Sequence, residues 1–267
     1  MSTDATDLAR AVLKDYSLSL LLIRQAHSAF FAVDKKEIIS MRHIVVLLGL
    51  DNITQIVMSC PRLPTSGPSL VKFQKSPFGH LMACSVMAAT IATHLAPIWD
   101  EDPEKFAICT MFHHLGETIM AYVAPSAFKI IWELRHTPNN MRRMSKRMTG
   151  WTPAALGLEL SRRWNLPRLI RLATAYKRHQ LGRIDDSERI ALNVAFYINQ
   201  MLFYAGLKKA MSAKRQREQW QDLKSLAKVE DKKLFSLFHK GIVEFKDKSP
   251  FLAEILWEQG VLSNLLI

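Results

Sequence analysis

DPEKFAICTMFHHLGETIMAYV, residues 102–123, combines strong helix signals with the densest group of titratable side chains in the chain. Asp102 can cap the N-terminus of a helix, because its carboxylate can accept a hydrogen bond from a free backbone N–H. Pro103 suits the first helical position, where its missing N–H costs nothing, and Glu104 suits the positive end of the helix. No proline follows before Val123, so the stretch predicts one buried helix.

Two adjacent histidines stand inside this apolar run. His113 shares one side of the predicted helix with Phe106, Cys109 and Met120, and His114 lies about 100° further round. Such a histidine is either a core residue whose ring bonds a backbone carbonyl or part of a metal or proton-transfer site. On these residues alone, the core role is the commoner one.

Segments on both sides of this stretch resemble a known family. FGHLMACSVMAATIATHLA precedes it, and TGWTPAALGLELSRRWNLPRLI and YKRHQ follow it. KDYSLSLLLIRQAHSAFF and ISMRHIVVLLGLDNI stand nearer the N-terminus. In this order, the segments resemble the landmarks of HDOD domains, regulatory domains of bacterial signalling whose helical bundle is related to that of HD phosphohydrolases. The resemblance covers residues 8–206.

Helical periodicity continues along the chain, with neither strand alternation nor a two-residue hairpin turn. Three prolines and a glycine between Cys60 and Ser69 interrupt the helices. We therefore predict an all-α fold, a multi-helix bundle of HD-like type with an N-terminal helical subdomain and a C-terminal helical extension. The predicted divisions are an HDOD domain over 1–206, made of a subdomain (1–60) and an HD-like bundle (70–206), and a basic extension over 207–267.

Two shorter segments, residues 49–57 and 141–148, predict which helix faces are buried and which are exposed. Gly49 is expected to end one helix, and a short helix from Asp51 should turn Ile53, Ile56 and Val57 inward. MRRMSKRM predicts a basic amphipathic helix whose methionines share one face: Met141, Met144 and Met148. The opposite face carries Arg142, Arg143, Lys146 and Arg147. This face is either a solvated surface, which is the commoner case, or a specific anion site.

Composition limits the class of protein. With 267 residues and 49% hydrophobic content, the chain can bury a substantial core. Cys60, Cys84 and Cys109 form no CxxC pair and the N-terminus has no secretory signal, so we expect a reduced, cytoplasmic protein. Residues 81–99 are uncharged but contain polar side chains, which favours a buried helix over a membrane span. The formal charge of +12 should attract an anionic partner without specifying which.

The resemblance implies where an HD phosphohydrolase would hold its metal. Its first histidine matches His80, and the histidine of its HD pair matches His113. The paired aspartate is replaced by His114, and the next histidine falls on Pro153. The later histidine pair falls on Arg178 and His179, and the final aspartate aligns with Phe196. Pro153, Arg178 and Phe196 cannot ligate a metal, and hard metals require carboxylates, so we expect no metal site. If one exists, it would hold zinc through His80, His113, His114 and His179.

The sequence contains no GxSxG, GxxxxGK[ST], HExxH or GxGxxG motif. We expect no catalytic residue and no cofactor, and interpret the chain as a cytosolic regulatory protein that binds another signalling protein. One alternative is a metal-dependent phosphohydrolase acting on a nucleotide or cyclic dinucleotide. The other is a nucleic-acid-binding regulator that uses its basic patches. Candidate interaction residues are Arg142, Arg143, Lys146, Arg147 and Arg178, and the apolar C-terminal helices could pair with the bundle or with a second copy of the chain.

Overall fold

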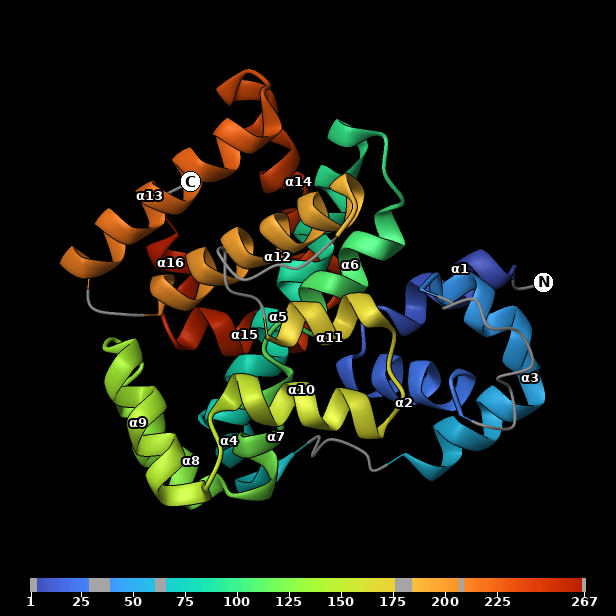
Figure 1. The fold of residues 1–267 in the computed structure, drawn as a ribbon, viewed down its shortest axis with the longest axis horizontal. Coiled ribbons are helices and arrows are strands. Elements are labelled where there is room, and N and C mark those ends of the chain that lie inside the picture. Colours follow the sequence, from blue (N-terminus) through green and yellow to red (C-terminus); the bar gives the residue numbers. More distant parts are fainter. Residues whose placement is uncertain (1–3, 29–38, 61–65, 176–183, 207–208, 266–267) are drawn as a thin grey trace.

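The computed structural model describes residues 4–28, 39–60, 66–175, 184–206 and 209–265, and every regular element within them is helical (Figure 1). The all-α prediction is confirmed. The first half comprises α1 (Ala5–Val12), α2 (Tyr16–Ala26), α3 (Met41–Ser59), α4 (Gly67–Gln74), α5 (Pro77–Leu95), the 3-10 helix η1 (Ala96–Trp99), α6 (Pro103–Met111), α7 (Leu115–Val123) and α8 (Pro125–Glu133). The second half comprises α9 (Pro138–Thr149), α10 (Pro153–Arg163), α11 (Arg168–Thr174), α12 (Asp186–Ala205), α13 (Lys209–Ala227), α14 (Asp231–Lys248), α15 (Pro250–Glu258) and α16 (Val261–Asn264).

Helix α5 lies at the centre of the molecule, with α6, α12, α14 and α15 packed around it (Figure 1). It carries no Asp, Glu, Lys or Arg, and most of its residues are buried, as expected for a helix that is apolar on every side. By length and composition, Met41–Ser59 and Pro77–Trp99 could each cross a membrane. The second of these segments is instead mostly buried inside the protein, which agrees with the prediction of a core helix.

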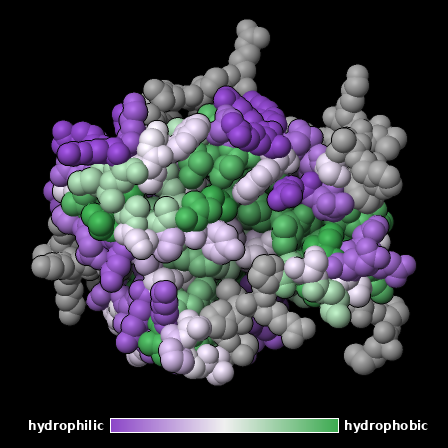
Figure 2. Space-filling view, turned by 90° about the horizontal axis from the view of Figure 1, so that it is seen from below, coloured by the Kyte–Doolittle hydropathy of each residue, from purple (hydrophilic) through white to green (hydrophobic). Residues whose placement is uncertain are grey.

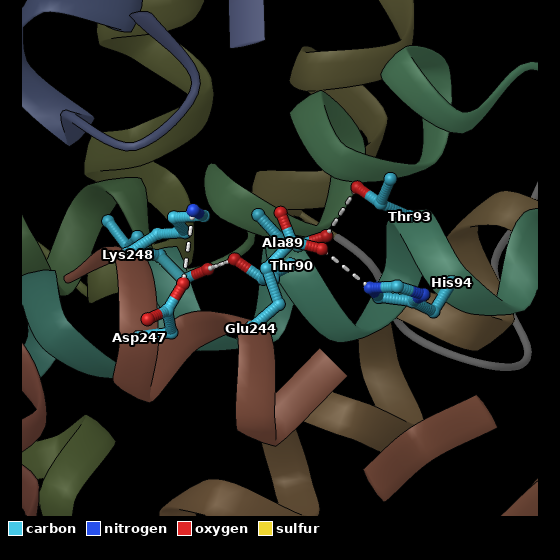
Figure 3. Close-up of polar contacts among 8 residues, drawn as sticks. Ala89, Thr90, Thr93, His94, Glu244, Asp247 and Lys248 are labelled. Atoms are coloured by element: carbon cyan, nitrogen blue, oxygen red, sulfur yellow. Dashed lines mark hydrogen bonds and ion pairs between the residues drawn. The ribbon is translucent and has the colours of Figure 1, made fainter. Parts of the chain in front are cut away.

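The C-terminal helices complete this core. Leu234, Phe238 and Phe245 of α14 are buried in the same cluster as residues of the N-terminal helices. The apolar faces of α14 and α15 are therefore covered by the bundle itself, and the division at residue 206 stays a prediction. His94 of α5 donates from Nε2 to Oε2 of Glu244 on α14 over 2.7 Å, and Figure 3 shows the two side chains pointing toward each other.

The single helix predicted over residues 102–123 is wrong, because the chain turns between α6 and α7 at Phe112–His114. Asn199 of α12 donates from Nδ2 to the Thr110 carbonyl oxygen over 3.0 Å. That carbonyl would bond the His114 N–H in a continuous helix. The turn lays α7 on α10, where a Cβ added at Gly116 would lie 1.9 Å from the Pro153 carbonyl oxygen.

The N-terminal end of α6 agrees with the prediction that Asp102 caps a helix. The Asp102 carboxylate accepts from the Glu104 N–H over 2.9 Å. Oε2 of Glu104 in turn accepts from Ser40 Oγ over 2.6 Å and from the Arg42 N–H over 3.1 Å. The first turn of α6 is thereby joined to the first turn of α3.

Helix α3 bends at Gly49, where φ is +72°, which confirms the predicted helix stop. Ile53 beyond the bend is buried, but Val57 is 46% exposed, so its predicted inward orientation is wrong. The buried residues of α3 all lie at or before Ile53. Val57 and three further apolar side chains of α3 are exposed, one before the bend and the others after it, and we call them together the α3 face: Val46, Leu50 and Met58.

Candidate functional site

The two adjacent histidines occupy the turn between α6 and α7, and both are buried. Their ring centroids lie 4.9 Å apart with the rings edge to face, and the His113 ring also meets Phe196 of α12 edge to face at 6.0 Å. Burial lowers the pKa of His113 well below its ordinary value, the neighbouring His114 lowers it further, and a hydrogen bond with the Ala173 backbone opposes both. His113 is therefore a neutral imidazole at neutral pH, inside a packed corner.

The first histidine of the HD pattern, His80, is held by other neighbours. Its Nδ1 bonds Oε1 of Gln259, and its Nε2 lies 3.5 Å from Cys84 Sγ. Because Gln259 donates from Nε2 to the Gln74 carbonyl over 2.7 Å, its Oε1 is the acceptor, and His80 carries its proton on Nδ1. Burial lowers the pKa of His80 to about 4 against the opposing effect of the Gln259 hydrogen bond, and the nearby charges of Arg135 and His114 lower it further.

The side chains present do not fit the metal site of an HD phosphohydrolase. Pro153 begins α10 with its carbonyl against Gly116, and Phe196 packs on His113. Within the described part of the chain, no group of three His, Cys, Asp or Glu side chains is placed to hold a metal ion. Arg178 and His179 lie outside the described residues. His114 and Phe196 thus stand at the positions matched to the two aspartates of the HD pattern, and the carboxylate near this corner is that of Glu117.

A cavity of about 530 Å³ opens beside His114, between α7, α9, α10 and α12. Phe203, Met141 and Pro153 contribute apolar wall, and Phe203 stacks on the His114 ring at 6.0 Å. Glu117 lies in the same wall, with Oε1 3.6 Å from His114 Nδ1. The basic side chains around this space are Arg135, Arg142, Arg143 and Lys146. We call it the basic cavity.

The basic cavity brings together part of the predicted set. Arg142, Arg143 and Lys146 line it with His114, whereas Arg147 lines a separate hollow with Leu134 and Met144, which Arg143 also borders. Arg178 lies outside the described residues. Met148, predicted to share the covered face of α9, is 39% exposed.

The sequence interpretation missed several lining residues: Glu117, Arg135, Gln200 and Phe203. Gln200 and Phe203 stand four and seven positions after Phe196 and so share its side of α12. This spacing could have identified them, since Phe196 occupies the position of an HD aspartate. Arg135 and Glu117 carried no comparable signal, because their approach to the cavity depends on the turns before α7 and α9.

Comparisons with known proteins agree with this geometry. The HDOD domain family model matches residues 1–180. A virulence factor from Campylobacter jejuni subsp. jejuni shares the fold, with a TM-score of 0.64, 17% identity, and coverage of 92% of this chain and 87% of that one. An HDOD domain protein of unknown function from Geobacter sulfurreducens gives a TM-score of 0.46, 18% identity, and coverage of 96% and 86%.

No curated protein matches the sequence. HDOD domains are associated with signal transduction and have an HD-like fold. Because the family model covers well over half of the sequence, this chain belongs to the HDOD domain family.

Proposed function

We propose that this protein is a non-catalytic signalling component of the cytoplasm that acts by binding another protein. The observation that carries the proposal is the packed corner of α6 and α7. There, His113 is neutral and in contact with Phe196, at a place where a phosphohydrolase needs metal ligands. The alternative, a metal-dependent phosphohydrolase, would need two aspartate ligands. The positions matched to those aspartates carry His114 and Phe196, which supply no carboxylate.

The α3 face is the surface we propose for the partner. Val46, Leu50 and Met58 are 65%, 67% and 76% exposed, and exposed apolar groups of this kind are typical of protein contacts. Val57 and Met58 follow Leu50 by seven and eight positions after the bend, a spacing that places the three on one side of that helical segment and suits a protein partner with a complementary apolar groove. The net charge of +12 further favours a partner with an acidic rim around that groove.

Large apolar side chains also reach the surface elsewhere, so the α3 face needs a direct comparison. Figure 2 shows hydrophobic surface on the face seen from below, broken up by hydrophilic side chains. Tyr122, Val123 and Ile130, near the junction of α7 and α8, are each more than half exposed. Trp257 of α15 is 63% exposed and stands alone on its helix, which makes it a suitable control position.

The test uses the full-length protein. A partner is captured from native cytosol by cross-linking, purified, and titrated calorimetrically with wild type, with a Leu50→Asp and Met58→Asp double variant, and with Trp257→Ser. We expect the double variant to bind roughly tenfold or more weakly, because charge enters an apolar contact, while Trp257→Ser binds as wild type does. Equal binding by all three proteins would reject the α3 face. Metal-dependent phosphodiester hydrolysis that disappears in His113→Ala would reject the non-catalytic assignment.

A further inference from the structure

We propose that the basic cavity binds a small organic phosphate. This inference concerns a ligand of the protein itself and does not depend on the α3 face or its partner. The volume of about 530 Å³ is that of a small-molecule site, and the cavity combines apolar wall with a few convergent polar groups.

The charge of the cavity lining is the first reason to expect an anionic ligand. The lining carries four basic side chains against a single carboxylate, that of Glu117, which already lies beside His114: Arg135, Arg142, Arg143 and Lys146. Arg135 also pairs with Glu133 outside the lining, at 4.0 Å. Within the described part of the chain, Arg142 and Lys146 have no ion-pair partner. A concave surface with such an excess of positive charge concentrates anions, and guanidinium groups match the paired oxygens of phosphate. The excess suits a multiply charged anion better than a monocarboxylate.

Two of the basic groups are already positioned. The Arg135 guanidinium lies over the Trp132 ring at 4.9 Å, and its Nη1 donates to the Trp132 carbonyl oxygen over 3.0 Å. Arg143 donates from Nη2 to Oδ1 of Asn140 over 2.7 Å. Because these side chains are partly immobilised before a ligand arrives, binding should lose less conformational entropy.

Helix termini give a second, independent reason. Thr152, Pro153 and Ala154, the cap and first two positions of α10, line the cavity. The Thr152 hydroxyl accepts from the Ala155 N–H over 3.3 Å, and Pro153 has no N–H, so Ala154 presents the first backbone donor of this helix. The positive end of α10 therefore adds to the field of the arginines at the place where helix N-termini bind phosphate.

The apolar wall indicates that the phosphate carries an organic group. Phe203 stacks on His114 and meets Trp132 edge to face at 5.7 Å, and Met141 is 7% exposed. A flat or apolar group could cover these side chains while its phosphate meets the basic side. Inorganic phosphate would leave this part of the cavity unused, so an organic phosphate should bind more tightly than phosphate alone.

The test is calorimetry and thermal unfolding of the full-length protein with AMP as probe, at physiological ionic strength. We expect AMP to bind and raise the melting temperature, pyrophosphate to bind more weakly, and adenosine to have no effect. Arg142→Gln and Lys146→Gln should each weaken AMP binding roughly tenfold, since each removes a charge-assisted contact. Both side chains are exposed, so the variants should fold.

Arg147→Gln is the matched control, because it removes the same charge from the same helix outside the cavity. It should change AMP affinity by less than about twofold. The proposal is overturned if AMP does not bind, or if Arg147→Gln weakens binding as much as the cavity variants do. Citrate binding as tightly as AMP, or an RNA oligonucleotide displacing AMP at lower concentration, would overturn it equally.

Discussion

At the scale of single residues, His80 and His113 behave as neutral parts of the core. His80 donates from Nδ1 to Gln259 on one side and faces Cys84 on the other, and its pKa falls to about 4 mainly through burial. His113 is buried against Phe196 and the Ala173 backbone. A proton on either ring would be an uncompensated buried charge, so both rings favour the folded state only while neutral.

This predicts how stability depends on pH. The folded pKa of His80, about 4, lies below its ordinary value of 6.5, so between these values the unfolded chain binds more protons than the folded one. The stabilisation is therefore complete above about pH 6.5 and is lost as the pH falls toward 4, by up to about 1.4 kcal/mol per pH unit for each such proton. Urea unfolding at a series of pH values measures it.

In His80→Gln, the free energy of unfolding should fall less steeply over this pH range. The glutamine keeps a hydrogen-bond donor for Gln259, but its side chain cannot take up a proton. His43→Gln, at an exposed position on α3, should keep the wild-type slope. A wild-type free energy of unfolding that stays level from pH 6.5 to 4, or a His80→Gln slope equal to that of wild type, would contradict the assignment.

At the scale of helices, close contacts at glycine decide the geometry. Gly116 lets α7 approach the first turn of α10, and Gly241 lets α14 approach α5, where an added Cβ would lie 2.6 Å from the Ile91 Cα. The break between α6 and α7 follows from the first of these contacts and from the bond of Asn199 to the Thr110 carbonyl. Both are tertiary interactions, which explains why the helical periodicity of residues 102–123 could not reveal the break.

The Gly241 contact gives a test at this scale. Gly241→Ala should destabilise the protein by roughly 1–3 kcal/mol, because the new methyl group meets the α5 backbone rather than a movable side chain. This loss must outweigh the helix propensity that alanine normally gains over glycine, about 1 kcal/mol. The measurement is chemical denaturation. Ser236→Ala, at an exposed position of the same helix, should be neutral or slightly stabilising, and a stabilised Gly241→Ala would contradict the close packing of α14 on α5.

At the scale of the whole molecule, the sequence predicted the family and the all-α class, because the landmark segments and the helix period are local. The family resemblance placed His80, His113, His114 and His179 in one hypothetical zinc site. Among the described members of this set, His113 and His114 meet as neighbouring rings, whereas His80 bonds Gln259 nearly 180 positions away. The basic cavity was only partly predicted, because its wall combines α7, α9, α10 and α12.

The two proposed surfaces lie apart in the fold. Figure 1 places α9, which carries Arg142 and Lys146, at one end of the longest axis, and α3 at the other. A small anion in the basic cavity would therefore leave the α3 face open to a protein. The non-catalytic assignment depends on the corner around His113 being a packed core and not a metal centre.

Thermal unfolding of wild type and His113→Gln, each with chelator and with excess zinc, tests that claim most directly. We predict that the melting temperature of each protein is the same under both conditions. The variant should be lower by an offset equivalent to about 1–3 kcal/mol, since it loses a buried, hydrogen-bonded ring. A wild-type melting temperature that falls with chelator and recovers with zinc, while His113→Gln does not respond, would show that the histidines hold a metal and contradict the account.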